Sequence, residues 1–213
     1  MKSSKRPAKS LQEIYQERYA TLEGIAPELR EHVAGFFEGH PRIDRITARA
    51  KGVTSFLDKA QKKENGKKKY RDPLSQIQDQ IGVRIVVFFR SDVERLDAIV
   101  KRYFQPIEYK DRVPDSEWEF GYFGRHYVLV LPNDVVLDGT SPDLVPHFFE
   151  LQIKTLFQHA WSEVEHDLGY KPGEAPLTSE QKRKLAFTSA QAWGADQIFE
   201  ELFQERQTCG NAS

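Results

Sequence analysis

The stretch FELQIKTLFQHAWSEVEHDLGYK, residues 149–171, changes its periodicity partway along, and this change decides the fold. Its first six residues alternate in polarity as a half-buried strand does, whereas the apolar residues after them are spaced like one face of a helix. That face comprises Leu156, Ala160, Trp161, Val164 and Leu168. We therefore expect a strand that runs directly into a helix. The ionisable residues on it are Glu150 on the strand and Glu163, Glu165, His166 and Asp167 on the helix.

Helical patterns are expected to dominate the region before this stretch. The segment SLQE places Ser10 as N-cap and Glu13 three residues later, a capping box that predicts a helix to about Phe37. A second helical pattern runs from Ile46 to Lys63, and a short helix is expected in DPLSQIQDQIG. The amphipathic segment SDVERLDAIVKRYF predicts another helix, with Ser91 or Asp92 as its cap.

Three segments read as strands: VRIVVFF, HYVLVLP and HFFELQIK, each rich in β-branched or aromatic residues. A last long helix is expected from about Ser179 to Gln204. Because helices and strands alternate along the chain, the expected fold class is α/β or α+β, a mixed β-sheet flanked by helices.

Composition limits the function classes. With 213 residues the chain fits one globular domain. Lys and Arg total 31 against 32 acids, so the net charge of −1 makes no global case for binding nucleic acid or an anionic membrane. The single cysteine, Cys209, excludes an internal disulfide and suits a reducing cytoplasm. The start MKSSKRPAKS lacks an apolar signal region, and no stretch has the length to span a bilayer, so we expect a cytoplasmic protein.

Charge is nevertheless uneven along the chain. The segment KKENGKKKYR, residues 62–71, gathers six cations around an Asn65-Gly66 turn. A solvated loop and a phosphate-binding loop are both consistent with this run.

Two acids stand at strand edges. Asp79 closely precedes VRIVVFF, and Glu150 is a polar residue within HFFELQIK. If the two strands are neighbours, both carboxylates can face one cavity and hold Mg²⁺, which prefers oxygen ligands and keeps substrate phosphates as its other partners. The alternative is that each acid caps a helix or pairs with a lysine.

A row of donors could complement such a metal. Arg49, Lys51, Ser55 and Lys59 follow one another over a short stretch and could take a triphosphate, although such residues often form only a solvated surface.

The segment EFGYFGRHY combines two glycines with Tyr122, Arg125 and His126. It predicts either a loop that stacks on a base or an ordinary loop with a core tyrosine. The histidines and the cysteine show no zinc-ligand spacing.

Taken in order, these motifs resemble the RelA/SpoT family of alarmone synthetases over about residues 42–172, and in size the small single-domain members. ELQIKTLFQHAWSEVEHDLGYK is similar to the family signature E-V-Q-I-R-T followed by A-W-A-E-I-E-H-D and Y-K. RITARAKGVTSFLDK resembles its ATP-binding segment R-x-K-x-x-x-S-x-x-x-K, and DQIGVRI its metal segment D-x-x-G-V-R-I. The resemblance divides the chain into a disordered basic start (1–9), an N-terminal helical segment (10–40), the synthetase core (42–172) and a C-terminal helix (178–205).

The resemblance implies a nucleotidyltransferase-like fold and the transfer of pyrophosphate from ATP to the 3′-hydroxyl of GDP or GTP, with release of AMP. On this basis Asp79 and Glu150 would hold Mg²⁺, and Glu150 would also activate the attacking hydroxyl. The ATP-binding residues would be Arg49, Lys51, Ser55, Lys59 and Arg84, with the two arginines on the adenine. The acceptor would be bound by Tyr122, which stacks on its base, and by His126, Gln152 and Lys154.

One departure concerns the acceptor. The family usually has P-K-x-N-G-Y-R-S before the stacking tyrosine, where the lysine meets the acceptor's phosphates, but this chain has DSEWEFGYFGRH, with Glu117 and Glu119. The alternative function is therefore a toxin that pyrophosphorylates the 3′ end of tRNA and is neutralised by an antitoxin. A nucleotide-binding regulator without activity is the third hypothesis, and homo-oligomerisation is compatible with each.

Overall fold

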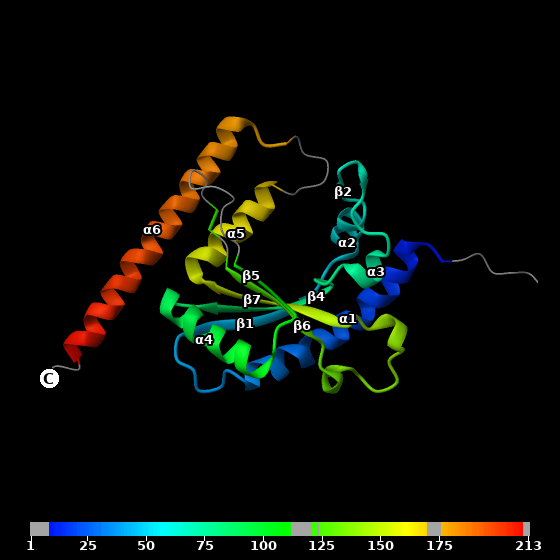
Figure 1. Ribbon diagram of the computed structural model, residues 1–213, viewed down its shortest axis with the longest axis horizontal. Helices are drawn as coiled ribbons and strands as arrows, with labels where there is room; N and C mark the ends of the chain where they lie inside the picture. Colours follow the sequence, from blue (N-terminus) through cyan, green and yellow to red (C-terminus); the bar gives the residue numbers. More distant parts are fainter. Residues whose placement is uncertain (1–8, 112–120, 123, 170–175, 211–213) are drawn as a thin grey trace, which may run out of the picture.

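A five-stranded mixed sheet forms the centre of the molecule in the computed structural model, which describes residues 9–111, 121–122, 124–169 and 176–210 (Figure 1). The described residues do not include residues 1–8, which belong to the segment expected to be disordered. They also do not include Glu117 and Glu119. The strands are β1 (Ile43–Ala50), β4 (Ile81–Val87), β5 (Glu108–Asp111), β6 (Arg125–Val130) and β7 (Phe148–Thr155). Their order in the sheet is β1-β4-β7-β6-β5.

The pairing of these strands confirms the expected mixed sheet. β4 and β7 are parallel neighbours, whereas β1 pairs with β4, and β6 with both β5 and β7, in antiparallel fashion. Strand β7, which carries Glu150, is therefore adjacent to β4, which begins two residues after Asp79. This adjacency was the condition for both acids to share a cavity. β5 was not predicted from the sequence.

Helices cover the sheet on both faces. Helices α1 (Leu11–Gly35) and α4 (Arg90–Tyr103) pack against one face through a buried core that includes Leu22, Leu29, Leu96 and Tyr127. Helix α5 (Leu156–Gly169) follows β7 without a loop, as predicted, and helix α6 (Ser179–Gly210) lies alongside it (Figure 1). The sheet thus has one face filled by core and one face left partly open beside α5.

The expected helix from Ile46 to Lys63 is wrong in its first part. Residues Ile43–Ala50 form strand β1, and only Val53–Ala60 are helical, as α2. Within β1 the residues Ile46 and Ala48 are half-buried while Thr47 is exposed, the period-two pattern of a strand at a sheet edge. Pairing with β4 decides the conformation against the helix propensity of the alanines and arginines in this segment.

Helix ends follow local chemistry. The capping box at the start of α1 is present, with the Ser10 side chain accepting from the Glu13 N–H. The cap of α4 differs from the expectation, because Phe89 is the N-cap residue and the Asp92 carboxylate accepts from its N–H at 3.3 Å. The expected apolar face of α5 is only partly buried: Trp161 is buried, whereas Val164 and Leu168 are about half exposed.

The remaining elements are short. Strands β2 (Lys63–Glu64) and β3 (Lys67–Lys68) form a hairpin whose turn residues, Asn65 and Gly66, have φ values of 51° and 77°, as a type I′ turn requires. A one-turn helix α3 (Pro73–Gln76) and two 3₁₀ turns, η1 (Asn133–Val135) and η2 (Pro142–Leu144), complete the described chain. None of the helices in the described ranges is long and apolar enough to cross a membrane.

Candidate active site

Two rows of side chains cross the open face of the sheet. In the first row, Arg49 of β1 pairs with Gly82 of β4, which pairs with Glu150 of β7. In the second, Thr47 pairs with Arg84, Arg84 with Gln152, and Gln152 with His126. Directly paired residues point to the same side of a sheet, so the pairing itself brings these side chains together.

A cavity of about 630 Å³ opens above these rows. It is lined by seven arginine and lysine side chains and four carboxylates, although the chain as a whole has a net charge of −1. Every residue proposed for ATP binding lines it, as do the two proposed metal ligands and three of the four proposed acceptor residues, all but Tyr122. A cavity with this excess of cations suits a polyanion such as a nucleotide triphosphate.

Asp79 is held by two lysines. Its Oδ2 atom accepts from the Lys51 ammonium at 3.1 Å and from the Lys59 ammonium at 2.8 Å. Burial alone would raise the pKa of Asp79, but these two cations outweigh it and hold the pKa below its usual value. The group is therefore ionised at neutral pH. Its other oxygen, Oδ1, is buried and has no hydrogen-bond partner among the described residues.

Glu150 is oriented by its neighbours in the second row. Its Oε1 atom lies 2.8 Å from His126 Nδ1, and its Oε2 atom accepts from the Gln152 amide at 2.7 Å. Burial would raise the pKa of Glu150, but the hydrogen bond and charge of His126 lower it, while Asp79 opposes this effect. The carboxylate is thus ionised and fixed at the centre of the cavity.

These two acids fit a divalent cation. The Asp79 Oδ1 atom lacks a partner among the described residues, and both carboxylates line the same cavity. Among the described residues no group of three or more acidic, histidine or cysteine side chains could hold a metal ion. Mg²⁺ is commonly bound by one or two carboxylates together with substrate phosphates, so a two-carboxylate site fits this ion.

The N-terminus of helix α2 adds further donors. Gly52, the N-cap residue, and Ser55 in the first turn both line the cavity. Since Gly52 has no side chain to satisfy the first N–H groups of the helix, these groups remain available to an anion. Lys59, one turn further on, reaches the cavity from the same helix.

The two arginines expected at the adenine differ in how firmly neighbouring residues hold their guanidinium groups. The Arg84 guanidinium donates to Gln152 Oε1 at 3.1 Å, lies 3.2 Å from His159 Nδ1 and forms an ion pair with Glu163. Arg49 is exposed at the cavity edge. One guanidinium is therefore fixed by helix α5, and the other can adjust to a ligand.

Lys154, one of the residues predicted to bind the acceptor, lines the cavity from β7. It is 5% exposed, and its ammonium donates to the Ser162 hydroxyl on α5 at 2.8 Å. Strand β7 thus contributes three alternate residues, at positions 150, 152 and 154, to the same face.

Tyr122 is not among the residues that line the cavity. It is 7% exposed, and its hydroxyl donates to the Asp196 carboxylate on α6, which also accepts from Thr155. Two residues later, a Cβ atom at Gly124 would lie 2.4 Å from the Ile153 carbonyl oxygen, so only glycine fits this close approach to β7. The structure therefore places Tyr122 between β7 and α6.

Sequence reasoning did not identify several residues that line the cavity, namely Arg45, Thr47 and His159. It noted Lys62 only as part of the cationic run 62–71, although Lys62 also lines the cavity. Arg45 and Thr47 could have been found, because a period-two reading of RITARA places them on the same face as Arg49. Of the helix α5 residues singled out in the sequence, Glu163, Glu165 and His166 line the cavity.

Two carboxylates and a row of cations on one open face of a sheet suit the transfer of phosphate groups, which depends mainly on positioning and charge neutralisation. The family model described as "Region found in RelA / SpoT proteins" matches residues 48–175. The chain belongs to the RelA/SpoT family.

One sequence relative and two crystal structures are similar to this chain. The GTP pyrophosphokinase YjbM of Bacillus subtilis (strain 168) is 31% identical over 175 residues, which cover 79% of this chain and 74% of that protein. The crystal structure of small alarmone synthetase 1 from Bacillus subtilis shares the fold, with a TM-score of 0.73, 24% identity and coverage of 92% of this chain and 99% of that one. The same synthetase bound to its product pppGpp gives a TM-score of 0.72 at 24% identity, with coverage of 92% and 99%.

Proposed function

We propose that this chain, a nucleotide pyrophosphokinase of the RelA/SpoT family, transfers pyrophosphate from ATP to the 3′-hydroxyl of GDP or GTP. The observation that carries the proposal is that Asp79, two residues before β4, and Glu150, on the adjacent strand β7, line one cationic cavity. The names of its relatives support it, since one is a GTP pyrophosphokinase and another was crystallised with its product pppGpp.

The donor nucleotide would lie against β1 and α2. Lys51, Ser55 and Lys59 would contact its phosphates, together with the first N–H groups of α2. Arg49 and Arg84 would enclose the adenine, because a guanidinium can stack on a purine ring. Mg²⁺ held by Asp79 and Glu150 would supply charge neutralisation at the phosphates.

The acceptor would lie against β6 and β7. Its 3′ oxygen attacks the β-phosphorus of ATP, the bond from that phosphorus to the oxygen shared with the α-phosphate breaks, and AMP leaves. Glu150 is placed to take the proton of the attacking hydroxyl, since its carboxylate is ionised and held by His126 and Gln152. To stack on the acceptor base, Tyr122 would have to turn from its buried position against Asp196 into the cavity.

The direct test is an incubation with ATP labelled on its terminal phosphate and, separately, GDP, GTP, ADP or bulk tRNA. We expect label on the guanine nucleotides together with an equal amount of AMP. The Glu150→Gln variant, which keeps the size of the side chain, serves as the inactive control. If no acceptor becomes labelled, the proposal is wrong.

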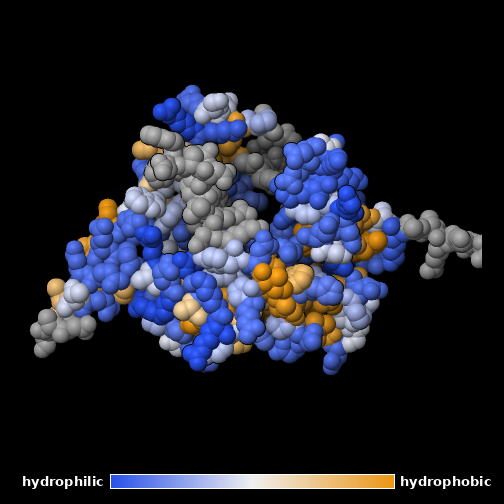
Figure 2. All heavy atoms as spheres, in the orientation of Figure 1, coloured by the Kyte–Doolittle hydropathy of each residue, from blue (hydrophilic) through white to orange (hydrophobic). Residues whose placement is uncertain are grey.

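A second candidate acceptor, the 3′ end of tRNA, is favoured by the lysine hairpin. Lys63, Lys67 and Lys68 are exposed on β2 and β3, and Lys62 at the base of the hairpin lines the cavity. In Figure 2 the lobe that holds this hairpin is almost uniformly hydrophilic. A polynucleotide would gain phosphate contacts here, which a mononucleotide in the cavity would not use, and its binding would weaken steeply with salt.

The same assay separates these candidates. Label on tRNA but on neither GDP nor GTP, with growth arrest on expression and no guanosine alarmone in the cells, would make tRNA the acceptor. A nucleotide-binding regulator has no need of two carboxylates at its phosphate site, so Asp79 and Glu150 favour an enzyme. A neutralising antitoxin, homo-oligomerisation and a cytoplasmic location stay predictions.

A further inference from the structure

Helix α1 lies outside the matched family region, residues 48–175, yet one of its faces touches the donor half of the cavity from behind. Tyr15 and Arg18, three residues apart, point from this face toward the segments that carry Lys51 and Asp79. Both residues are buried, with exposures of 0% and 7%. Both side chains therefore make their contacts inside the protein.

Tyr15 holds the main chain of Lys51. Its hydroxyl donates to the Lys51 carbonyl oxygen at 2.8 Å. Its ring stacks on Phe56 of α2, with the ring centroids 3.6 Å apart and the planes 3° from parallel. Burial and the nearby Asp79 charge raise the pKa of Tyr15, so the hydroxyl keeps its proton and remains a donor.

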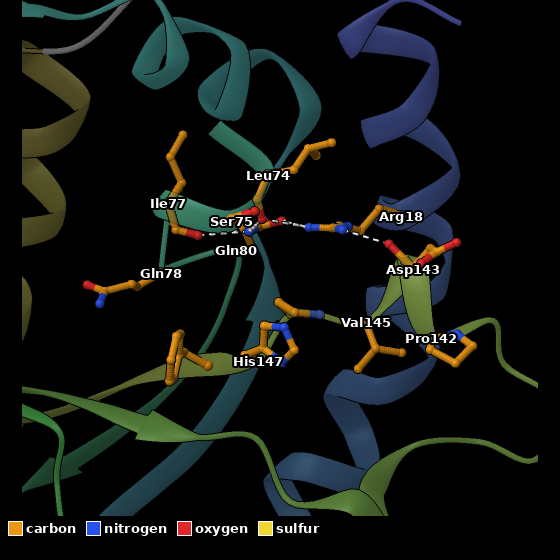
Figure 3. A pocket seen from close by; sticks show the side chains of 12 residues that line it. Arg18, Leu74, Ser75, Ile77, Gln78, Gln80, Pro142, Asp143, Val145 and His147 are labelled. Atoms are coloured by element: carbon orange, nitrogen blue, oxygen red, sulfur yellow. Dashed lines mark hydrogen bonds between the residues drawn. The ribbon is translucent and has the colours of Figure 1, made fainter. Parts of the chain in front are cut away.

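Arg18 holds the residue next to Asp79. Its guanidinium donates to the Gln80 side-chain oxygen at 2.9 Å, to the Leu74 carbonyl at 2.9 Å and to the Asp143 carbonyl at 2.7 Å (Figure 3). A cavity of about 290 Å³ opens beside it, but these donors are directed to protein oxygens. Arg18 is therefore better suited to hold the segment before β4 than to bind a ligand.

The two contacts close into a ring. The Lys51 N–H donates to the Gln80 carbonyl oxygen at 2.8 Å, so the main chains on either side of the Lys51–Asp79 ion pair are joined. Gln80 is 1% exposed, and its amide donates to the Leu74 and Ile77 carbonyls at 2.8 Å each. Each member of this ring is held by at least one hydrogen bond to another member.

We propose that Tyr15 and Arg18 are positioning residues for the donor site, which set Lys51 and Asp79 at the spacing that the ATP phosphates and their metal require. The inference rests on the proposed function. Its physical basis is that phosphate transfer depends mainly on placing charges, and a displacement of about 1 Å can cost roughly 100-fold in rate. Neither residue touches a substrate.

Tyr15→Phe is the sharpest test, because it removes one hydroxyl and keeps the stacked ring. Loss of the donor removes the Tyr15 hydrogen bond from the Lys51 carbonyl, and we expect kcat/KM for ATP to fall about tenfold. The KM of the acceptor should stay unchanged. Exchange of the Lys51 amide hydrogen should accelerate by a similar factor, relative to amides in the β4–β7 core.

Tyr127→Phe is the matched control. Tyr127 is also a tyrosine of 0% exposure, and its hydroxyl donates to Asp97 of α4 at 2.7 Å, away from the donor site. The two variants should lose similar stability, but only Tyr15→Phe should lose affinity for an ATP analogue. If both variants weaken the analogue equally, or if Tyr15→Phe weakens donor and acceptor alike, the positioning role is wrong.

Arg18→Lys gives a second measurement, since lysine keeps the charge but cannot reach all three oxygens at once. We expect the same selective loss for ATP and faster exchange of the Lys51 amide. If the wild-type protein transfers no pyrophosphate, the proposed function fails. Binding of a non-hydrolysable ATP analogue and amide exchange at Lys51 would then still test the inference, because neither depends on turnover.

Discussion

The donor half and the acceptor half of the cavity are built differently. On the donor side, Lys51 and Lys59 meet Asp79 at 3.1 and 2.8 Å, and α1 supports them from behind. On the acceptor side, Glu150 is held by its strand neighbours, whereas Tyr122 is tied to α6 and residues 112–120 lie outside the described residues. The comparison shows that the proposed donor residues are held by ion pairs and by α1, whereas the proposed acceptor residues are held by β7 and α6.

The largest expected effect is on the two carboxylates, which both halves share. Asp79→Asn and Glu150→Gln should each lower kcat at least about 100-fold, because each removes a metal or proton contact of the transition state. Circular dichroism should show an intact fold. Near-normal turnover in either variant would contradict the site described above.

Lys59→Met should affect the donor half alone. The substitution keeps most of the apolar stem but removes a charge that would contact the ATP phosphates, so the KM for ATP should rise roughly ten- to hundredfold. The KM for the acceptor should not change in steady-state assays. Lys68→Met, on the exposed β3 strand, is the matched control and should leave both constants unaltered for a nucleotide acceptor.

Tyr122→Ala should affect the acceptor half. A base stacked on an aromatic ring contributes about 1–3 kcal/mol, so the KM of the acceptor should rise by roughly tenfold or more while that of ATP changes little. Tyr122→Phe removes only the hydroxyl bonded to Asp196 and should have a smaller effect in the same direction. Equal losses for donor and acceptor would mean that Tyr122 is purely structural.

The smallest effect concerns stability at Asp196, which is 1% exposed and has a buried oxygen without a partner in the described part of the chain. Burial raises the pKa of Asp196 above its usual value. Between the unfolded and the folded pKa the folded state binds more protons, so the free energy of unfolding falls as pH rises through this window. Asp196→Asn should remove this slope in urea titrations from pH 4 upward and raise stability at pH 7 by about 1 kcal/mol. A slope that persists in the variant would assign it to another group.

Local sequence signals predicted the parts of the fold that local chemistry controls. The capping box at Ser10, the change of period at Thr155 and the turn at Asn65-Gly66 each depend on neighbouring residues, and each was confirmed. The placement of Asp79 and Glu150 in one cavity could be anticipated, because Asp79 closely precedes one buried strand and Glu150 lies within another.

Long-range pairing determined what the sequence did not reveal. Residues 46–50 of β1 were assigned to a helix because Ile46, Val53, Phe56 and Ala60 follow a helical spacing, whereas pairing with β4 makes them a strand. β5 exists through its pairing with β6. The contacts of Tyr15 with Lys51 and of Arg18 with Gln80 join distant parts of the chain. Such side-chain contacts produce no periodic pattern in the sequence.

Calorimetric titration tests most directly whether the donor half is preassembled. The wild-type protein would be titrated with Mg²⁺ and a non-hydrolysable ATP analogue, and separately with GDP. Because the donor cations are already in place, we expect the analogue to bind without the acceptor, at least about tenfold more tightly than GDP alone. Tighter binding of GDP than of the analogue, or no binding of the analogue until GDP is present, would contradict a preassembled donor half.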